Sequence, residues 1–267
     1  MIRPAAVAGR FYPADAAMLL RQIDGCVSVA PQKIRARGCI VPHAGYVYSG
    51  HVAGVVYGTL DLPSRFILLG PRHYPQGERL AILSEGAWTT PLGDAKIDAP
   101  LADALKGAFP LLREDAVAHS TEHSLEVQLP FLQRIARDFT FVPVVIGTDR
   151  FDALEMLGRA VAQVVRVQKE AVLIVASSDM NHRESDAITR VKDRKAIDAI
   201  LALDARELYD TVRRENITMC GYGPAVAMLT AARELGSTSA ELLQYATSGD
   251  VNGDHEDVVG YAGIIVR

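Results

Sequence analysis

Short apolar runs rich in β-branched residues alternate with longer stretches of helical periodicity, and this alternation limits the fold more than any other feature of the sequence. Strands are expected in the runs that begin at Arg37, Phe66, Phe139, Ala171 and Val258. Helices are expected over residues 49–60, 124–137, 151–167, 188–203, 205–214 and 224–235. Strands that alternate with helices predict an α/β fold with a largely parallel central sheet flanked by helices.

The chain is long enough for one large domain or two small ones. Of its 267 residues, 49% are apolar, which is enough to build a substantial core. Glycine and proline are dispersed, no linker or shift in composition divides the sequence, and no internal repeat is present. We therefore expect residues 1–267 to form a single domain.

Charge and apolar content argue against nucleic acid and membrane as partners. The net charge of −4 provides no basic surface for a phosphate backbone. No apolar run approaches the ~20 residues that span a bilayer, and the opening MIRPAAVAGRFYPAD lacks the continuous core of a signal peptide. Three cysteines without CxxC spacing do not predict a disulfide framework, so a cytoplasmic location is expected.

Three predicted strands end in a loop that carries a histidine. These are His43 after IVP, His73 after the Gly-Pro that ends strand 66–69, and His182 in SSDMNH. Ligand sites of open α/β sheets lie at the carboxyl ends of the strands, so the three side chains are expected to converge. Neutral imidazole is the commonest metal ligand among side chains, which favours a metal site. Each histidine taken alone is equally well explained as a loop side chain bonded to backbone.

Cys220 is a fourth candidate ligand. It stands just before the helix predicted over 224–235, and a helix N-terminus favours the thiolate, which binds iron, copper or zinc. A buried, inert cysteine is the alternative. Asp179 stands three residues before His182, where its carboxylate either orients the imidazole or caps the next helix; the two serines of this motif allow the same two interpretations.

A second histidine cluster occurs in HSTEHSLEVQLP. His119 and His123 have the spacing to share a helix face, although an N-cap at Ser120 or Thr121 would separate them. Glu122 belongs to this cluster or is a first-turn charge that favours the helix dipole. The GxGxxG and P-loop motifs of nucleotide sites and the GxSxG of serine hydrolases do not occur in the sequence.

Several motifs, taken in order, give the sequence a resemblance to a known family. PHAGYVYSG, GPRHY, EHSLEVQLPFL, SSDMNH, TMCGYGP and YATSGD, with the opening PAAVAGRFYPAD, resemble the Memo family over nearly the whole chain. The resemblance implies a fold similar to the class III extradiol dioxygenases, which hold Fe(II) with two histidines and a carboxylate. It also implies two partners, an AMMECR-type protein and a radical-SAM protein.

The same resemblance assigns roles to individual residues. It makes His43 and His73 metal ligands, and it places Cys220 where the dioxygenases have their acidic ligand. His182 takes the position of the acid/base histidine, with Asp179 beside it. Further side chains are expected around the pocket: Glu122 and His123 from the family pattern, Arg72 where the family commonly has a small polar residue, and Tyr46 as an aromatic that can line a groove.

Two functions are compatible with these assignments. The first is a mononuclear non-haem metal protein, with Fe(II) favoured and copper as the alternative, that acts as an oxidoreductase with His182 moving a proton. Because a thiolate is softer and more oxidisable than a carboxylate, Cys220 predicts little cleavage of simple catechols. The second is a non-catalytic module that captures a peptide or small molecule in the same pocket.

Overall fold

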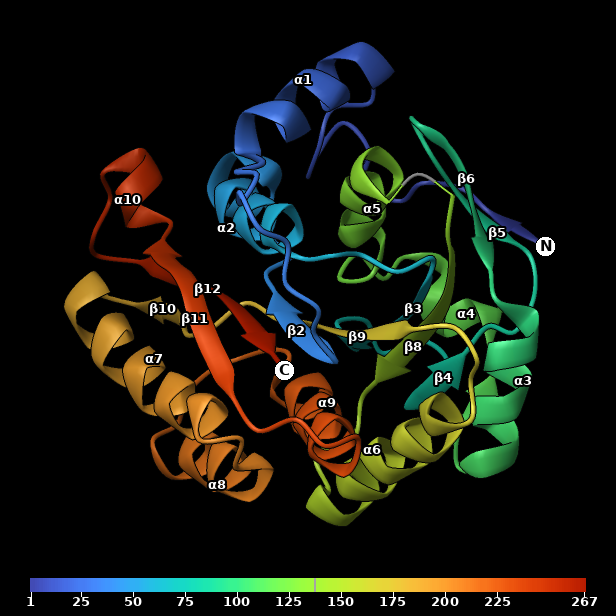
Figure 1. Cartoon of the computed structure of the whole chain (residues 1–267). Helices are drawn as coiled ribbons and strands as arrows, with labels where there is room; N and C mark the ends of the chain where they lie inside the picture. Colours follow the sequence, from blue (N-terminus) through green and yellow to red (C-terminus); the bar gives the residue numbers. More distant parts are fainter. Residues whose placement is uncertain (137) are drawn as a thin grey trace.

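In the computed structural model, which describes residues 1–136 and 138–267, the chain folds around one mixed sheet (Figure 1). The strands are β1 Ile2–Arg3, β2 Gly38–Val41, β3 Arg65–Pro71, β4 Leu80–Ile82, β5 Ala87–Thr90, β6 Gly93–Ile97, β7 Arg113–Glu114, β8 Thr140–Ile146, β9 Val172–Ser177, β10 His182–Glu184, β11 Ala240–Thr247 and β12 Val258–Val266. The helices are α1 Ala16–Cys26, α2 Tyr46–Thr59, α3 Ala99–Ala108, α4 Ala116–Ser120, α5 Leu129–Ile135, α6 Phe151–Arg166, α7 Asp186–Leu201, α8 Ala205–Arg214, α9 Tyr222–Glu234 and α10 Gly249–Asn252, with the 3-10 helix η1 Glu126–Gln128. The predicted α/β class is confirmed.

The centre of the sheet is parallel, in the order β8-β3-β9-β2. Beyond β2 the sheet continues with β12, which is antiparallel to β2 and also pairs with β10 and β11. Beyond β8 it continues with the β5–β6 hairpin and with β1. Parallel neighbours point their carboxyl ends to the same edge, so the loops that follow β2, β3 and β9 lie together.

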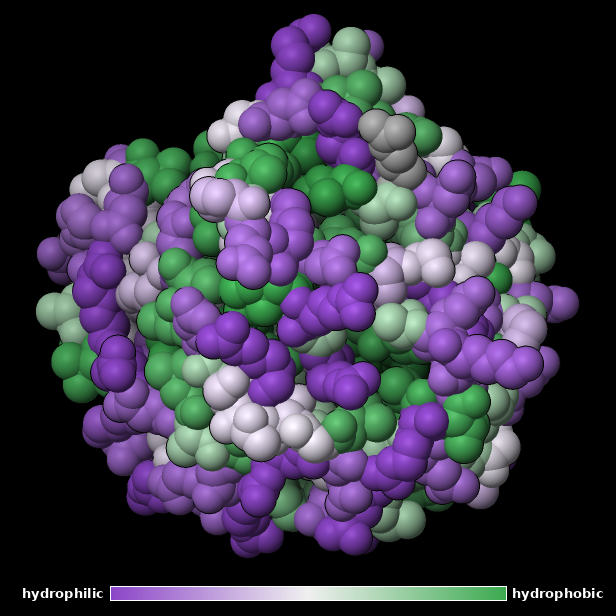
Figure 2. Space-filling view, in the orientation of Figure 1, coloured by the Kyte–Doolittle hydropathy of each residue, from purple (hydrophilic) through white to green (hydrophobic). Residues whose placement is uncertain are grey.

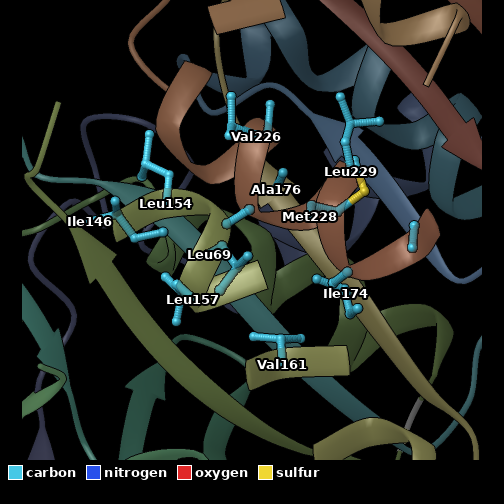
Figure 3. Close-up of a cluster of buried hydrophobic side chains, with 14 of the residues drawn as sticks. Leu69, Ile146, Leu154, Leu157, Val161, Ile174, Ala176, Val226, Met228 and Leu229 are labelled. Carbon is cyan, nitrogen blue, oxygen red and sulfur yellow. The ribbon is translucent and has the colours of Figure 1, made fainter. Parts of the chain in front are cut away.

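Alternate residues of the central strands face opposite sides of the sheet and build two apolar layers. In β3, Ile67 and Leu69 belong to the layer that contains α6 and α9, whereas Phe66 and Leu68 belong to the layer that contains α1, α2 and α5. Both layers are buried, and together they hold the strand-end loops in place. Figure 3 shows part of the first layer, with side chains from β3, β9, α6 and α9: Leu69, Ile174, Leu157 and Met228.

Two elements around the histidine loops are longer than predicted. Strand β3 does not end at Leu69, because Gly70 and Pro71 continue the pairing with β8. Helix α2 begins at Tyr46, three residues earlier than predicted, and the Tyr46 N–H donates to the carbonyl oxygen of Phe11 at 2.7 Å. The loop that carries His43 is therefore limited to residues 42–45, and His73 lies two residues after the end of β3.

The helix predicted over 124–137 is wrong as a single element. The segment forms η1 and then α5, which begins at Leu129 with Pro130 in its first turn. Arg137, the end of the predicted helix, lies outside the described residues. Helix α1, the β5–β6 hairpin and the outer strand β11 were not predicted; the two strands of the hairpin are short and β11 is only half-buried, so their periodicity is weak.

Helices α1 and α2 cross closely. At Gly54 an added Cβ would overlap the carbonyl oxygen of Cys26, so only glycine permits this approach. Figure 2 shows hydrophilic and hydrophobic residues intermixed over the face of the molecule seen in Figure 1. None of the helices in the described part of the chain combines the length and apolarity needed to cross a membrane.

Candidate metal centre

The loops after β2 and β3 bring His43 and His73 together, with ring centroids 5.2 Å apart. His123, from the turn after α4, stacks on His73 at 4.4 Å and lies 5.6 Å from the ring of His43. One ring nitrogen of each residue can be chosen so that all three lie within 4.8 Å of one another. His43 is 2% exposed, whereas the side chain of His73 is 26% exposed and open to solvent.

The tautomer of His43 is fixed by its surroundings. Its Nδ1 lies 2.9 Å from the hydroxyl oxygen of Ser177. The Ser177 hydroxyl donates its only proton to the carbonyl oxygen of Ser124 and accepts a hydrogen bond from the side-chain amide of Gln128. Ser177 therefore accepts from Nδ1–H of His43, and Nε2 of His43 keeps its lone pair. Burial lowers the pKa of His43 well below its usual range, which keeps the ring neutral.

Glu122 fixes His73 in the same way. Its carboxylate accepts from the backbone N–H of His73 at 2.8 Å and lies 2.8 Å from Nδ1 of the same residue. Burial opposes ionisation of Glu122, but the hydrogen bonds from His73 and Ser124 lower its pKa to about 2. An ionised carboxylate only accepts, so Nδ1 of His73 carries a proton that it donates to Glu122.

His123 is the least satisfied of the three histidines. No residue of the described chain offers a hydrogen bond to its buried Nδ1. Burial, with the charges of His43 and His73, lowers its pKa to about 4, so the ring is neutral near pH 7. The sequence analysis placed His123 near the pocket but not among the ligands; in space it is grouped with His43 and His73.

Cys220 lies against this group. Its Sγ is 3.2 Å from Nε2 of His43, and it stands just before α9, whose N-cap is Gly221. Burial and then the charge of Asp179 raise the pKa of the Cys220 thiol well above its usual value. The expected thiolate is therefore not favoured in the protein without an ion, because desolvation outweighs the helix N-terminus.

Asp179 and His182 form hydrogen bonds with different residues. Burial raises the pKa of Asp179, and its carboxyl group accepts from the backbone N–H groups of His43 at 2.7 Å and Ala44 at 3.3 Å, so it holds the His43 loop. His182 is held by Thr218: its backbone N–H donates to the Thr218 hydroxyl at 2.7 Å, and its Nδ1 lies 3.0 Å from the Thr218 carbonyl oxygen. A carbonyl only accepts, so Nε2 of His182 is the basic nitrogen.

The remaining predicted pocket residues point elsewhere. The Arg72 guanidinium donates to the carbonyl oxygens of Pro75 and Gly77 within its own loop. The Tyr46 hydroxyl donates to the carbonyl oxygen of Val127 at 2.6 Å, inside the core. His119 is fully buried in α4, which ends at Ser120 with Thr121 as its C-cap; the predicted N-cap at Ser120 or Thr121 is therefore wrong, although His119 and His123 are separated as expected.

Two side chains that orient the site were missed as such. Ser177 was recognised only as one of two serines able to orient a ring or cap a helix, and its neighbours Ser124 and Gln128 decide between these roles. Thr218 stands two residues before Cys220, and nothing in its sequence context indicates contact with His182. Only the fold could reveal either role.

The donor set fits a single metal ion. In both His43 and His73 the Nδ1–H is held by a protein acceptor, as in most metal-binding histidines, and Nε2 of His43 faces the Cys220 sulfur. His123 supplies a third neutral ring to the same group, and its buried Nδ1 has no hydrogen-bond partner in the described part of the chain. Imidazole donors suit iron, copper and zinc.

Comparisons with known proteins give one family. A family model described as Memo-like protein matches residues 3–265. A MEMO1 family protein of Methanosarcina acetivorans is 44% identical over 270 residues, covering 100% of this chain and 99% of the relative. One of Aquifex aeolicus is 41% identical over 266 residues, covering 99% and 98%. The structure of an uncharacterized protein of Escherichia coli K12 has a similar fold, with a TM-score of 0.57 and 14% identity over 86% of this chain and 100% of the other.

Proposed function

The chain belongs to the Memo-like family, and we propose that it is a metal-dependent oxidoreductase that holds one redox-active ion on His43, His73 and His123. The observation that carries the proposal is the grouping of three ring nitrogens within 4.8 Å. The Glu122 carboxylate lies 2.8 Å from Nδ1 of His73 and 3.7 Å from Nδ1 of His123 but forms no contact with the ring of His43. A bound cation would be shared by all three rings, because imidazole nitrogens are common metal ligands.

Fe(II) is the favoured ion and copper the alternative. Imidazole accepts either ion, and the class III dioxygenases that the family resembles use iron. Cys220 adds a soft sulfur donor next to His43, which increases the affinity for Cu(I). A bound cation would also reverse the electrostatic balance at Cys220 and favour its thiolate.

The proposed ion, His182 and His73 have separate roles in this function. A redox-active ion, when bound, supplies Lewis acidity and electron transfer. His182 accepts or returns a substrate proton at Nε2, because Thr218 already holds the proton on Nδ1. His73, with 26% of its side chain exposed, marks the side from which a small molecule reaches the centre.

Metal content after anaerobic purification tests the proposal. We expect close to one equivalent of iron or copper, lost in His73→Ala. The matched control is His255→Ala, which removes an exposed histidine from the loop before β12 and should retain the ion. Protein that takes up neither Fe(II) nor Cu(I) on anaerobic loading would refute the proposal.

A non-catalytic ligand-binding role is the second candidate. Tyr74 is 37% exposed and meets His123 edge-on at 6.1 Å, and Phe11 meets the same ring at 4.7 Å. These aromatic rings favour capture of a peptide or small molecule beside the histidines. Tight ligand binding by metal-free protein, lost in Tyr74→Ala, would support this role. Association with an AMMECR-type and a radical-SAM protein is a further proposal, tested by co-purification with each.

A further inference from the structure

Arg3 lies more than a hundred residues from the histidine turn in sequence but holds it in space. Its Nε donates to the carbonyl oxygen of His119 at 2.6 Å, and its Nη2 donates to that of Glu122 at 2.8 Å. Nη1 pairs with the Glu126 carboxylate at 2.6 Å, and the guanidinium lies 4.0 Å from the ring centroid of Trp88. Arg3 is 5% exposed and Glu126 is fully buried.

These bonds act on the residue that orients a proposed ligand. Arg3 holds the main chain of Glu122, and the side chain of Glu122 holds His73 through both its backbone N–H and Nδ1. The next residue along the chain is His123. The Arg3 guanidinium therefore holds the main chain beside His123 and, through Glu122, also holds His73, two of the three grouped histidines. A planar fork with several donors can satisfy these acceptors together, which an ammonium group cannot.

Glu126 connects the same turn to the segment that follows Arg3. Its carboxylate accepts from the backbone N–H groups of Ala6 and Val7 and from the Tyr12 hydroxyl at 2.6 Å. Immediately before Tyr12, Phe11 places its ring 4.7 Å from that of His123. The segment 3–12 is therefore fastened over the turn at both ends.

We infer that Arg3 is a positioning residue of the metal centre, acting through the Glu122 carbonyl to hold the Glu122 carboxylate and the His123 ring in their places. The metal arm of its test rests on the proposed function. The measurement of the histidine tautomers in metal-free protein does not depend on the proposed function.

Arg3→Lys is the test variant because it keeps the positive charge opposite Glu126 and loses the fork. Arg3→Gln is a second variant; Glu126 retains three other donors in both, and circular dichroism verifies that each variant is folded. The matched control is Arg65→Lys. Arg65 also forms a bidentate pair, with Asp98 at 2.6 and 2.9 Å, but at the start of β3 and so at the opposite end of that strand from His73.

The first measurement is ring ¹⁵N NMR of the metal-free protein. Wild type and Arg65→Lys should show His73 as one tautomer with the proton on Nδ1, whereas Arg3→Lys and Arg3→Gln should show a mixture. The second is titration with Co²⁺, followed by its visible absorption. Loss of groups that support metal ligands typically weakens affinity ~10–100-fold, and we expect that range for Arg3→Lys but less than about 2-fold for Arg65→Lys.

The outcomes separate the two proposals. If wild type binds no Co²⁺ but the tautomer of His73 still depends on Arg3, the metal proposal fails and the positioning role stands. An unchanged His73 ring and unchanged Co²⁺ affinity in folded Arg3→Lys would overturn the positioning role. An equal loss in Arg65→Lys would overturn it as well, because the effect would then be one of general stability.

Discussion

Asp193→Asn should remove a pH dependence that one buried carboxyl group imposes on the stability of the fold. Asp193 lies in α7 and is fully buried; its two oxygens accept from the Asn181 backbone N–H at 2.8 Å and the Tyr245 hydroxyl at 2.7 Å. Its pKa is raised to about 6, chiefly by burial and slightly by the nearby Glu184, against the opposing effect of the two hydrogen bonds and of Arg190.

The sign follows from the two pKa values. Between an unfolded pKa of about 3.9 and the folded value of about 6, the native state binds the proton more tightly, so stability is lost as pH rises through this window. A shift of about two units corresponds to roughly 3 kcal/mol, of which about 2–3 kcal/mol falls between pH 4 and pH 7. Asparagine does not titrate, so the variant lacks this loss.

The assay is guanidinium denaturation from pH 4 to pH 7.5, followed by fluorescence of Trp88, the only tryptophan. The free energy of unfolding of Asp193→Asn minus that of wild type should rise by about 2–3 kcal/mol across this range, since other groups cancel in the difference. Asp98→Asn is the control: burial raises the pKa of Asp98, but hydrogen bonds from Arg65, Thr140 and Leu101 lower it below its usual value, so Asp98 stays ionised over this pH range and its variant should show a nearly constant difference from wild type. Parallel curves for wild type and Asp193→Asn would refute the reasoning.

Three further predictions concern the site and the packing around it. His123→Ala should abolish stoichiometric metal binding, whereas His182→Ala should keep the ion and lose only turnover. Metal analysis of both purified variants tests this, and loss of metal in both would make His182 a ligand. Ser177→Ala should weaken Co²⁺ affinity ~10–100-fold by freeing the tautomer of its histidine partner, and unchanged affinity in a titration would contradict this. Gly54→Ala should lower the free energy of unfolding by about 1–3 kcal/mol, because its methyl group would overlap the end of α1. The control Gly107→Ala, on α3 with open space around it, should raise the free energy of unfolding by up to about 1 kcal/mol. Equal effects of the two variants in a denaturation experiment would disprove the packing argument.

The parallel part of the fold was predictable because its signal is local. Runs such as 171–177 are too apolar and too short to be anything but buried strands, and parallel strands give their ends a common direction. His43 and His73 could therefore be placed on one edge from the sequence alone. Half-buried β11 and the β5–β6 hairpin lack such runs and were missed.

The details of the site depend on contacts that no periodicity records. His123 joins the other two histidines because α4 ends at Ser120 and the following turn is fastened by Arg3, whose partners lie over a hundred residues away. The position of a proton on an imidazole depends on whether its neighbour can accept, and for Ser177 this is decided by what else its hydroxyl contacts. These proton positions depend on tertiary contacts, which the spacing of residues in the sequence does not reveal.

The frame around the three histidines is made of protein groups. Ser177 and Glu122 hold the rings of His43 and His73, and two extensive apolar layers support the sheet that carries their loops. Small zinc-dependent domains are different, because there the ion supplies the folding free energy. In this protein a chelator should remove the proposed ion without unfolding the chain, and a different ion should then bind to the folded protein, because the two apolar layers rather than the metal supply the folding free energy.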